Sequence, residues 1–150
     1  MSDDPAAGRI EGRTHILPVR VYYEDTDFSG LVYHANYLRF FERGRSDFLR
    51  QTGVTHIALQ SLDTAIAVVE MNIKFRAAAR IDDALAVRTR FDTLNGPRFL
   101  ISQTIECAGA LIAEAIVAAC CISLTGRAKR PPAGFVDRIK PHLDPARSRF

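Results

Sequence analysis

The feature that most constrains the fold is a repeated alternation of apolar and polar residues along the chain. It occurs at residues 15–24, 69–75 and 85–92. A period of two residues predicts β-strands with one buried and one exposed face. We expect the strand at 85–92 to pair with the one at 69–75, which it follows. In the first stretch the alternate positions are Leu17, Val19, Val21 and Tyr23.

Two further strands are predicted nearer the C-terminal end. The turn sequence Asn95-Gly96 leads into residues 99–108, which predicts a hairpin with the strand at 85–92. Residues 110–125 are apolar on both faces, which indicates a strand covered on both sides. Their many alanines leave a helix open as the alternative.

One stretch has the period of a helix. It runs from Asn36, the expected N-cap, to about Thr52, with Gly53 as the stop signal. Together these segments predict an α+β fold, a curved antiparallel sheet of about five strands wrapped around one long central helix. Such a sheet leaves its outer face and edges uncovered, so we expect a homodimer or homotetramer. The apolar residues of the helix are Tyr37, Phe40, Phe41, Phe48 and Leu49.

The chain divides into three predicted segments. Residues 14–132 form the predicted domain, and a length of 150 residues suits one core. Residues 1–13 are expected to be a disordered N-terminal segment or an expression remnant, because IEGR at 10–13 reads as either a leftover protease site or native sequence. Residues 133–150 form a basic, proline-containing C-terminal tail.

The bulk composition excludes several classes of protein. A net charge of +3 without a basic cluster is too weak a field to indicate nucleic-acid binding. No apolar stretch is long enough to span a bilayer, and the N-terminus lacks the apolar centre of a secretory signal, so we expect a cytoplasmic protein. The three cysteines have no metal-ligand spacing, and we expect neither a metal nor a disulfide.

Groups that can carry out chemistry gather at residues 22–37, immediately before the predicted helix. A helix start offers unpaired N–H groups that can stabilise a carbonyl oxygen as it gains negative charge. A carboxylate of the preceding loop could act on that carbonyl as a general base or a nucleophile, which would suit ester or thioester hydrolysis. The simpler interpretation is that Asp25, Asp27 and Ser29 only cap turns.

The whole string resembles a known family. Tyr-Tyr-Glu-Asp-Thr-Asp-x-x-Gly-x-Val-Tyr-His-x-x-Tyr at Tyr22 to Tyr37, continued by Phe40-Phe41-Glu42-Arg43-Gly44-Arg45, is similar to hotdog-fold acyl-CoA thioesterases. The likeness is to the 4-hydroxybenzoyl-CoA thioesterase-like group and, within it, the Tol-Pal-associated branch. It extends over roughly residues 15–132 and implies hydrolysis of acyl-CoA to free acid and coenzyme A, without a cofactor, since coenzyme A is part of the substrate.

The resemblance also implies roles for individual residues. Asp27 would be the catalytic carboxylate, as nucleophile or as general base, with His34 and Tyr23 as further catalytic residues. Phe28 and Ser29 stand where relatives often carry small residues, which could reshape the acyl end of the pocket. The implied substrate-binding residues near the thioester are Gly30, Val32, Tyr33, Ala35 and Asn36, with the backbone N–H groups near Tyr33 to Ala35 on the thioester oxygen.

Charge alone suggests residues for the coenzyme A phosphates. Lys74 and Arg76 are the first candidates, because phosphate attracts Lys and Arg. Further candidates are Arg88, Arg90, Arg127, Lys129 and Arg130. Acyl-carrier protein remains open as the thiol carrier.

The same residues also allow alternative functions. Some relatives use a glutamate on the central helix, and Glu42 is the candidate of that kind. A hotdog hydratase is disfavoured, because such enzymes place an aspartate and a histidine about five positions apart and the separation here is seven (34 − 27 = 7). A non-catalytic acyl-thioester or acyl-carrier-protein binder, or a scaffold linked to envelope or phospholipid metabolism, stays open as the second hypothesis.

Overall fold

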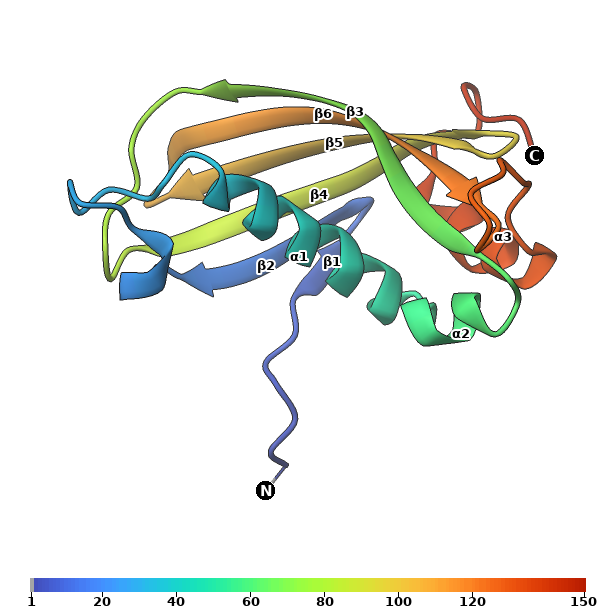
Figure 1. The fold of residues 1–150 in the computed structure, drawn as a ribbon, viewed down its shortest axis with the longest axis horizontal. Coiled ribbons are helices and arrows are strands. Elements are labelled where there is room, and N and C mark those ends of the chain that lie inside the picture. The colour runs from blue at the N-terminus through green and yellow to red at the C-terminus, as the bar shows by residue number, and fades with distance from the viewer. Residues whose placement is uncertain (1) are drawn as a thin grey trace.

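The computed structural model describes residues 2–150, which form a six-stranded antiparallel sheet with helix α1 packed against it (Figure 1). The strand order is β1-β2-β4-β5-β6-β3, so β1 and β3 are the two edges. The strands are β1 (Arg9–Glu11), β2 (Thr14–Arg20), β3 (Ala65–Phe75), β4 (Ala84–Asn95), β5 (Arg98–Cys107) and β6 (Ala110–Ile122). The helices are α1 (Asn36–Gln51), α2 (His56–Gln60) and α3 (Ala133–Ile139), with 3-10 turns at Tyr23–Asp25 and Lys140–His142.

The predicted number of elements needs correction. The sheet has six strands rather than about five, because Arg9–Glu11 pairs with β2 as an additional edge strand. Helix α1 has 16 residues, and two short helices accompany it. The hairpin predicted around Asn95-Gly96 is confirmed by the pairing of β4 with β5. The strand interpretation of residues 110–125 is confirmed by β6.

Two details of the strand predictions are wrong. Strand β3 pairs with β6 and not with β4, because the segment that follows β3 carries the chain past β6 and β5, and β4 then lies between β2 and β5. Strand β2 ends at Arg20 and does not continue to Glu24, so Tyr23 lies outside it in a 3-10 turn. The reason is local, because the side chain of Asp25 accepts the backbone N–H of Tyr22 and gives the chain an alternative to ladder bonds.

Aromatic side chains of α1 fill the space between helix and sheet. Phe40, Phe41 and Phe48 are fully buried. The ring of Phe48 stacks on Phe91 of β4 at a centroid distance of 4.7 Å. Helix and sheet approach closely at Gly44, where a Cβ atom would lie 2.7 Å from the Thr89 hydroxyl oxygen. Apolar burial of this kind is the main stabilising contribution to the fold.

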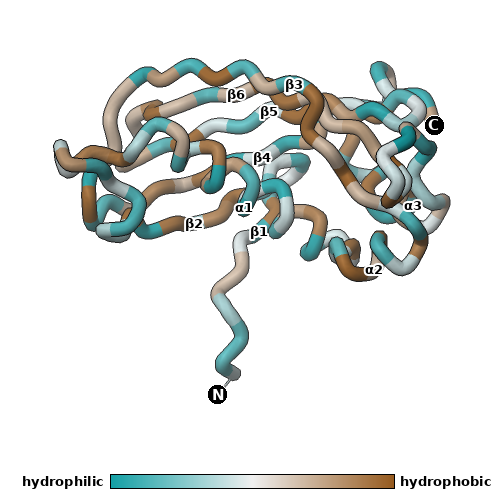
Figure 2. The backbone as a smooth tube through the Cα atoms, viewed as in Figure 1, coloured by the Kyte–Doolittle hydropathy of each residue, from teal (hydrophilic) through white to brown (hydrophobic). Residues whose placement is uncertain are grey.

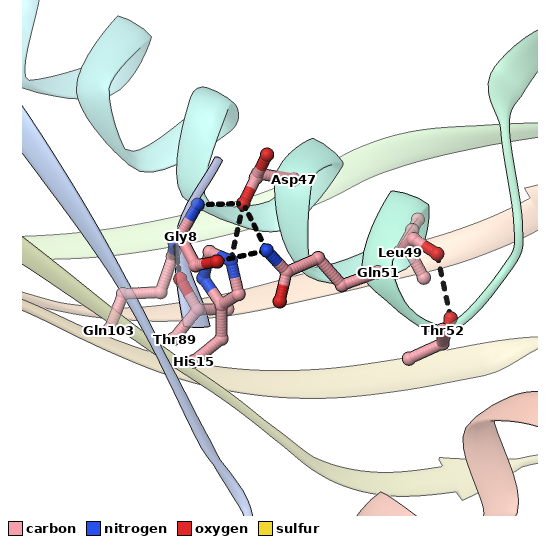
Figure 3. Close-up of polar contacts among 8 residues, drawn as sticks. All are labelled: Gly8, His15, Asp47, Leu49, Gln51, Thr52, Thr89 and Gln103. Carbon is pink, nitrogen blue, oxygen red and sulfur yellow. Dashed lines mark hydrogen bonds and ion pairs between the residues drawn. The ribbon is translucent and has the colours of Figure 1, made fainter. Parts of the chain in front are cut away.

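The N-terminal segment is tied to α1 by polar contacts (Figure 3). The carboxylate of Asp47 accepts the backbone N–H of Gly8 at 2.9 Å and lies 2.6 Å from Nε2 of the fully buried His15. Gln51 donates to the carbonyl of Gly8. The proposed boundaries at residues 13 and 132 stay a prediction. The structure places β1 before the first boundary, and Phe135, Ile139 and Leu143 pack into the core after the second.

Several large apolar side chains remain exposed. In Figure 2 the edge strand β3 carries a hydrophobic stretch, and Val68, Val69 and Phe75 of this strand are exposed. Phe28 extends fully into solvent. Among residues 2–150 no helix is long and apolar enough to cross a membrane.

Candidate active site

A tight turn presents Asp27 at the tip of the loop before α1. The N–H of Asp27 donates to the carbonyl of Leu31, and the N–H of Gly30 donates to the carbonyl of Asp27. Thr26 and Val32 pair across the base of the loop. Gly30 has a φ of 79°, a left-handed conformation that strongly favours glycine. The Gly of the Asp-x-x-Gly string therefore closes the turn that holds the carboxylate.

The carboxylate of Asp27 is ionised, and only one of its two oxygens accepts hydrogen bonds. Its Oδ1 accepts the backbone N–H of Ser29 at 2.8 Å and the Ser29 hydroxyl at 2.5 Å. These two hydrogen bonds, with a smaller effect of His34, lower the pKa of Asp27 below the ordinary aspartate value. Within residues 2–150 no group donates to Oδ2. Asp27 thus caps a turn, as the simpler interpretation expected, and still has one oxygen free to react.

Asp25 joins the loop to the start of α1. Its buried carboxylate accepts the Tyr22 N–H at 2.8 Å and the side-chain amide of Asn36 at 2.7 Å. The expectation that Asn36 is the N-cap is wrong, because the N-cap is Ala35 and the Asn36 side chain is committed to Asp25. The sequence pattern did not separate Asp25 from Asp27, since both read as turn-capping acids. Only burial distinguishes the positioning residue from the exposed one.

The helix start has two backbone N–H groups without an acceptor. Tyr33 donates to the carbonyl of Asp25 at 3.0 Å, and Asn36 donates to the carbonyl of Tyr33 at 2.8 Å. In the part of the chain that the structure describes, the N–H groups of His34 and Ala35 donate to nothing. Of the backbone N–H groups predicted to bind the thioester oxygen, those of Tyr33 to Ala35, only those of His34 and Ala35 are therefore available.

Asp27 and Ala35 line one surface hollow of about 340 Å³. Tyr33 and Asn36 also line it. Arg39, in the first turns of α1, completes one side. Sequence reasoning did not single out Arg39, and the signal that could have found it is its spacing of four residues from Ala35, which puts both on one helix face.

Other predicted site residues lie around this hollow or away from it. The ring of His34 lies 4.6 Å from that of Tyr33 and 6.4 Å from that of Phe75, outside the lining of the hollow. Tyr23 is 83% exposed and does not line the hollow in this chain. Val32 is buried beneath the loop, where its N–H donates to the carbonyl of Ala79.

The predicted phosphate-binding residues lie elsewhere. Arg76 pairs with Glu114 at 3.1 Å, and Lys74 lines a separate hollow on the sheet with Glu114. Glu42 accepts the hydroxyl of Ser46 at 2.5 Å and does not line the hollow of Asp27. Among residues 2–150 no group of three or more His, Cys, Asp or Glu side chains could hold a metal ion.

Comparison with known proteins places this geometry in a family. The model of the thioesterase-like superfamily matches residues 21–139. The chain is 38% identical over 125 residues to the acyl-CoA thioesterase YbgC of Haemophilus influenzae, covering 83% of this chain and 90% of that protein. It is 41% identical over 125 residues to the acyl-CoA thioester hydrolase YbgC of Escherichia coli O157:H7, covering 82% and 93%.

Solved structures agree in fold. A probable thioesterase from Bartonella henselae has a TM-score of 0.77 at 42% identity, over 79% of this chain and 99% of that one. A 1,4-dihydroxy-2-naphthoyl-CoA thioesterase from Synechocystis has a TM-score of 0.76 at 28% identity, over 83% and 93%. The chain therefore belongs to the thioesterase-like superfamily, and it is a thioester hydrolase with the hotdog fold.

Proposed function

We propose that this chain hydrolyses acyl-CoA thioesters to a free acid and coenzyme A, with Asp27 as the catalytic carboxylate. The observation that carries the proposal is that Asp27 and Ala35 line the same hollow, and that the backbone N–H of Ala35 has no acceptor among residues 2–150. The relatives with about two fifths of their residues identical are acyl-CoA thioesterases by name, which supports the choice of substrate.

The chemistry needs charge stabilisation on the carbonyl oxygen and an attack on the carbonyl carbon. In the proposed arrangement the thioester oxygen accepts the N–H groups of His34 and Ala35, which stabilise it as negative charge develops. Asp27 approaches with its free Oδ2. It either attacks the carbonyl carbon and expels the coenzyme A thiolate, leaving an anhydride for water to cleave, or removes a proton from the attacking water.

The other predicted site residues around Asp27 have supporting roles in this proposal. His34 makes a smaller contribution than the two Ser29 hydrogen bonds to the lowered pKa of Asp27. Asn36 and Asp25 hold the loop against the helix. Gly30 and Val32 shape the turn. Tyr23 has its side chain exposed on the same loop, and its catalytic role requires contact with substrate or a second copy.

The test is a free-thiol assay on a panel of acyl-CoAs. We expect Asp27→Asn to lower kcat by roughly a hundredfold or more, because the substituted amide can still accept both Ser29 bonds but cannot act as base or nucleophile. Glu24→Gln is the matched control, since Glu24 is an exposed acid of the same hollow. Full activity of Asp27→Asn, or an equal loss in the control, would refute the assignment.

A labelling experiment can identify the anhydride route. In a single turnover in water enriched in oxygen-18, an anhydride cleaved at the aspartyl carbon leaves the label in the peptide that carries Asp27. General-base catalysis and an anhydride cleaved at the acyl carbon both place the label only in the released acid. Label in the Asp27 peptide, measured by mass spectrometry, is therefore the outcome that establishes Asp27 as nucleophile.

The thiol carrier and the contacts to its phosphates are part of the same proposal. Lys74 and Arg76 are the proposed contacts for the coenzyme A phosphates, although Arg76 must leave Glu114 to serve in that way. Comparing acyl-CoA with the same acyl group on acyl-carrier protein tests the carrier. Charge removal at Lys74 should raise KM for the CoA substrate and leave kcat unchanged.

We also propose that the chain assembles as a homodimer or homotetramer. Strand β3 is an edge with unpaired backbone groups and exposed Val68 and Val69, and Phe28 and Tyr23 are exposed beside the site. Exposed apolar side chains gathered on an edge strand typically mark an interface. Light scattering of the purified chain should give a multiple of 16.7 kDa, and a monomer at micromolar concentration would contradict the proposal.

A further inference from the structure

The positive charge of the chain is concentrated in its last 25 residues. Residues 126–150 hold seven Lys and Arg side chains and two acids, a sum of +5 (7 − 2 = 5). Because the formal net charge of the whole chain is +3, the preceding residues sum to −2 (3 − 5 = −2). The net charge therefore understates the local field at the C-terminal end.

The end of this segment is a fixed part of the fold. Residues 140–150 follow the part of the chain that matches the family model. They return to the end of β4, where the N–H of Arg149 donates to the carbonyl of Leu94 at 2.8 Å and the N–H of Gly96 donates to the carbonyl of Arg149 at 3.2 Å. Figure 1 shows the C-terminus and α3 at the opposite end of the sheet from the loop before α1.

The cations of this end are exposed and exceed the acids around them. Among residues 2–150 none of them forms an ion pair with a carboxylate. Asp137 and Asp144 reduce the charge of the five cations without cancelling it (5 − 2 = 3), and a terminal carboxylate still leaves an excess. The five exposed cations are Arg130, Arg138, Lys140, Arg147 and Arg149.

An apolar surface lies beside these cations. A hollow of about 260 Å³ is lined by Leu94, Pro131, Ala133, Val136 and Phe150, with Arg130 and Asp137 as its charged members. The side chain of Phe150 is 47% exposed, and Nζ of Lys140 lies 4.9 Å from the centre of its ring. The same end of the molecule thus presents positive charge and an exposed aromatic ring together.

From this arrangement we infer that the C-terminal end is a docking surface for a membrane of anionic phospholipids. The cations lie against the lipid phosphates, and the ring of Phe150 enters the boundary between the headgroups and the acyl chains. Such a surface combines negative charge with an apolar layer, which matches both properties of this end. The inference goes beyond the proposed hydrolysis and does not depend on it.

The spacing of the cations favours a lipid surface over an acidic protein. Within the described residues only Arg130 of the five lines the hollow, so the cations do not converge on one groove. Lipids move laterally and can gather under each cation, whereas the carboxylates of a protein would have to stand at matching fixed positions.

Sedimentation of the full chain with lipid vesicles tests the inference. We expect the chain to sediment with vesicles of equal parts phosphatidylglycerol and phosphatidylcholine, and to stay in solution with vesicles of phosphatidylcholine alone. Salt at about 1 M shortens the range of the field to about 3 Å and should release most of the bound chain. No sedimentation with the anionic vesicles, or equal sedimentation with both kinds, would overturn the inference.

Variants of the tail assign the attachment to this surface. Each cation near an anionic surface strengthens binding about fivefold, so Lys140→Gln, Arg147→Gln and Arg149→Gln combined should weaken it roughly a hundredfold. Phe150→Ser removes no charge and should weaken it roughly fivefold, because a half-exposed ring no longer enters the lipid. Circular dichroism checks that each variant is folded.

A matched variant controls for net charge. Arg20→Gln, Arg43→Gln and Arg50→Gln combined remove the same charge from exposed positions outside residues 126–150, and should change vesicle binding much less than the tail variant. An equal loss in both triple variants would show general attraction only and would refute the surface. Binding of polyglutamate without binding of anionic vesicles would assign the cations to an acidic protein instead and would also overturn the inference.

Discussion

Replacing Asp25 by alanine tests whether this carboxylate positions the loop that carries Asp27. The buried carboxylate accepts one backbone and one side-chain N–H, at 2.8 and 2.7 Å. A hydrogen bond to a charged group contributes about 1.5–3 kcal/mol, and a buried donor left without a partner costs about 1–3 kcal/mol. Because these terms overlap, we expect Asp25→Ala to lower the free energy of unfolding by about 3 kcal/mol.

A double-mutant cycle isolates the contact with the helix. Asn36→Ala alone leaves Asp25 with the Tyr22 N–H, so the coupling between the two substitutions should be about 2 kcal/mol. Urea denaturation followed by circular dichroism measures all four proteins. Glu24→Ala, an exposed neighbour, is the control and should change stability by about 0.5 kcal/mol or less.

The loop variant should also lose activity. With Asp25 removed, the turn that carries Asp27 is no longer fixed to the helix start, and small displacements of a reacting group are costly, so kcat should fall roughly tenfold or more. A stability of Asp25→Ala within about 0.5 kcal/mol of the unmodified chain, or a coupling near zero, would refute the positioning role.

Three further predictions concern pH and the backbone. Burial lowers the pKa of His15 more than its contact with Asp47 raises it, so the unfolded chain binds a proton at a higher pH than the folded chain does. The free energy of unfolding should therefore fall as pH drops below about 6.5, and it should fall less in His15→Gln. A free energy of unfolding from urea denaturation that does not change with pH would contradict this. The pKa read from the acidic limb of the pH profile of kcat/KM should lie below the ordinary aspartate pKa of about 3.9, because the pKa of Asp27 is lowered. A higher pKa would indicate that another group is essential. Gly30→Ala should cost about 1 kcal/mol in thermal or urea denaturation because φ is 79°, whereas Gly134→Ala, which meets nothing within 4 Å, should not destabilise the chain.

The sequence by itself determined the types of the main elements. The helical spacing of residues 37–49 predicted α1, and the Asn-Gly turn predicted the β4–β5 hairpin. These patterns are readable because side-chain period depends on local backbone geometry alone. The string around Asp27 likewise predicted that the loop before the helix carries the active site, and this stays a prediction.

Tertiary structure decided the rest, because it depends on contacts between distant residues. The pairing of β3 with β6 joins residues between 38 (Phe75 with Ala113) and 57 (Ala65 with Ile122) positions apart, which no local period encodes. Burial separated Asp25, held by Asn36, from the exposed Asp27, although both are acids of one loop. Hydrogen bonds that exist only in the folded chain occupied the N–H of Tyr33 and left that of Ala35 free. The local sequence could suggest candidate reacting groups, but only the fold sets which of them line a common hollow.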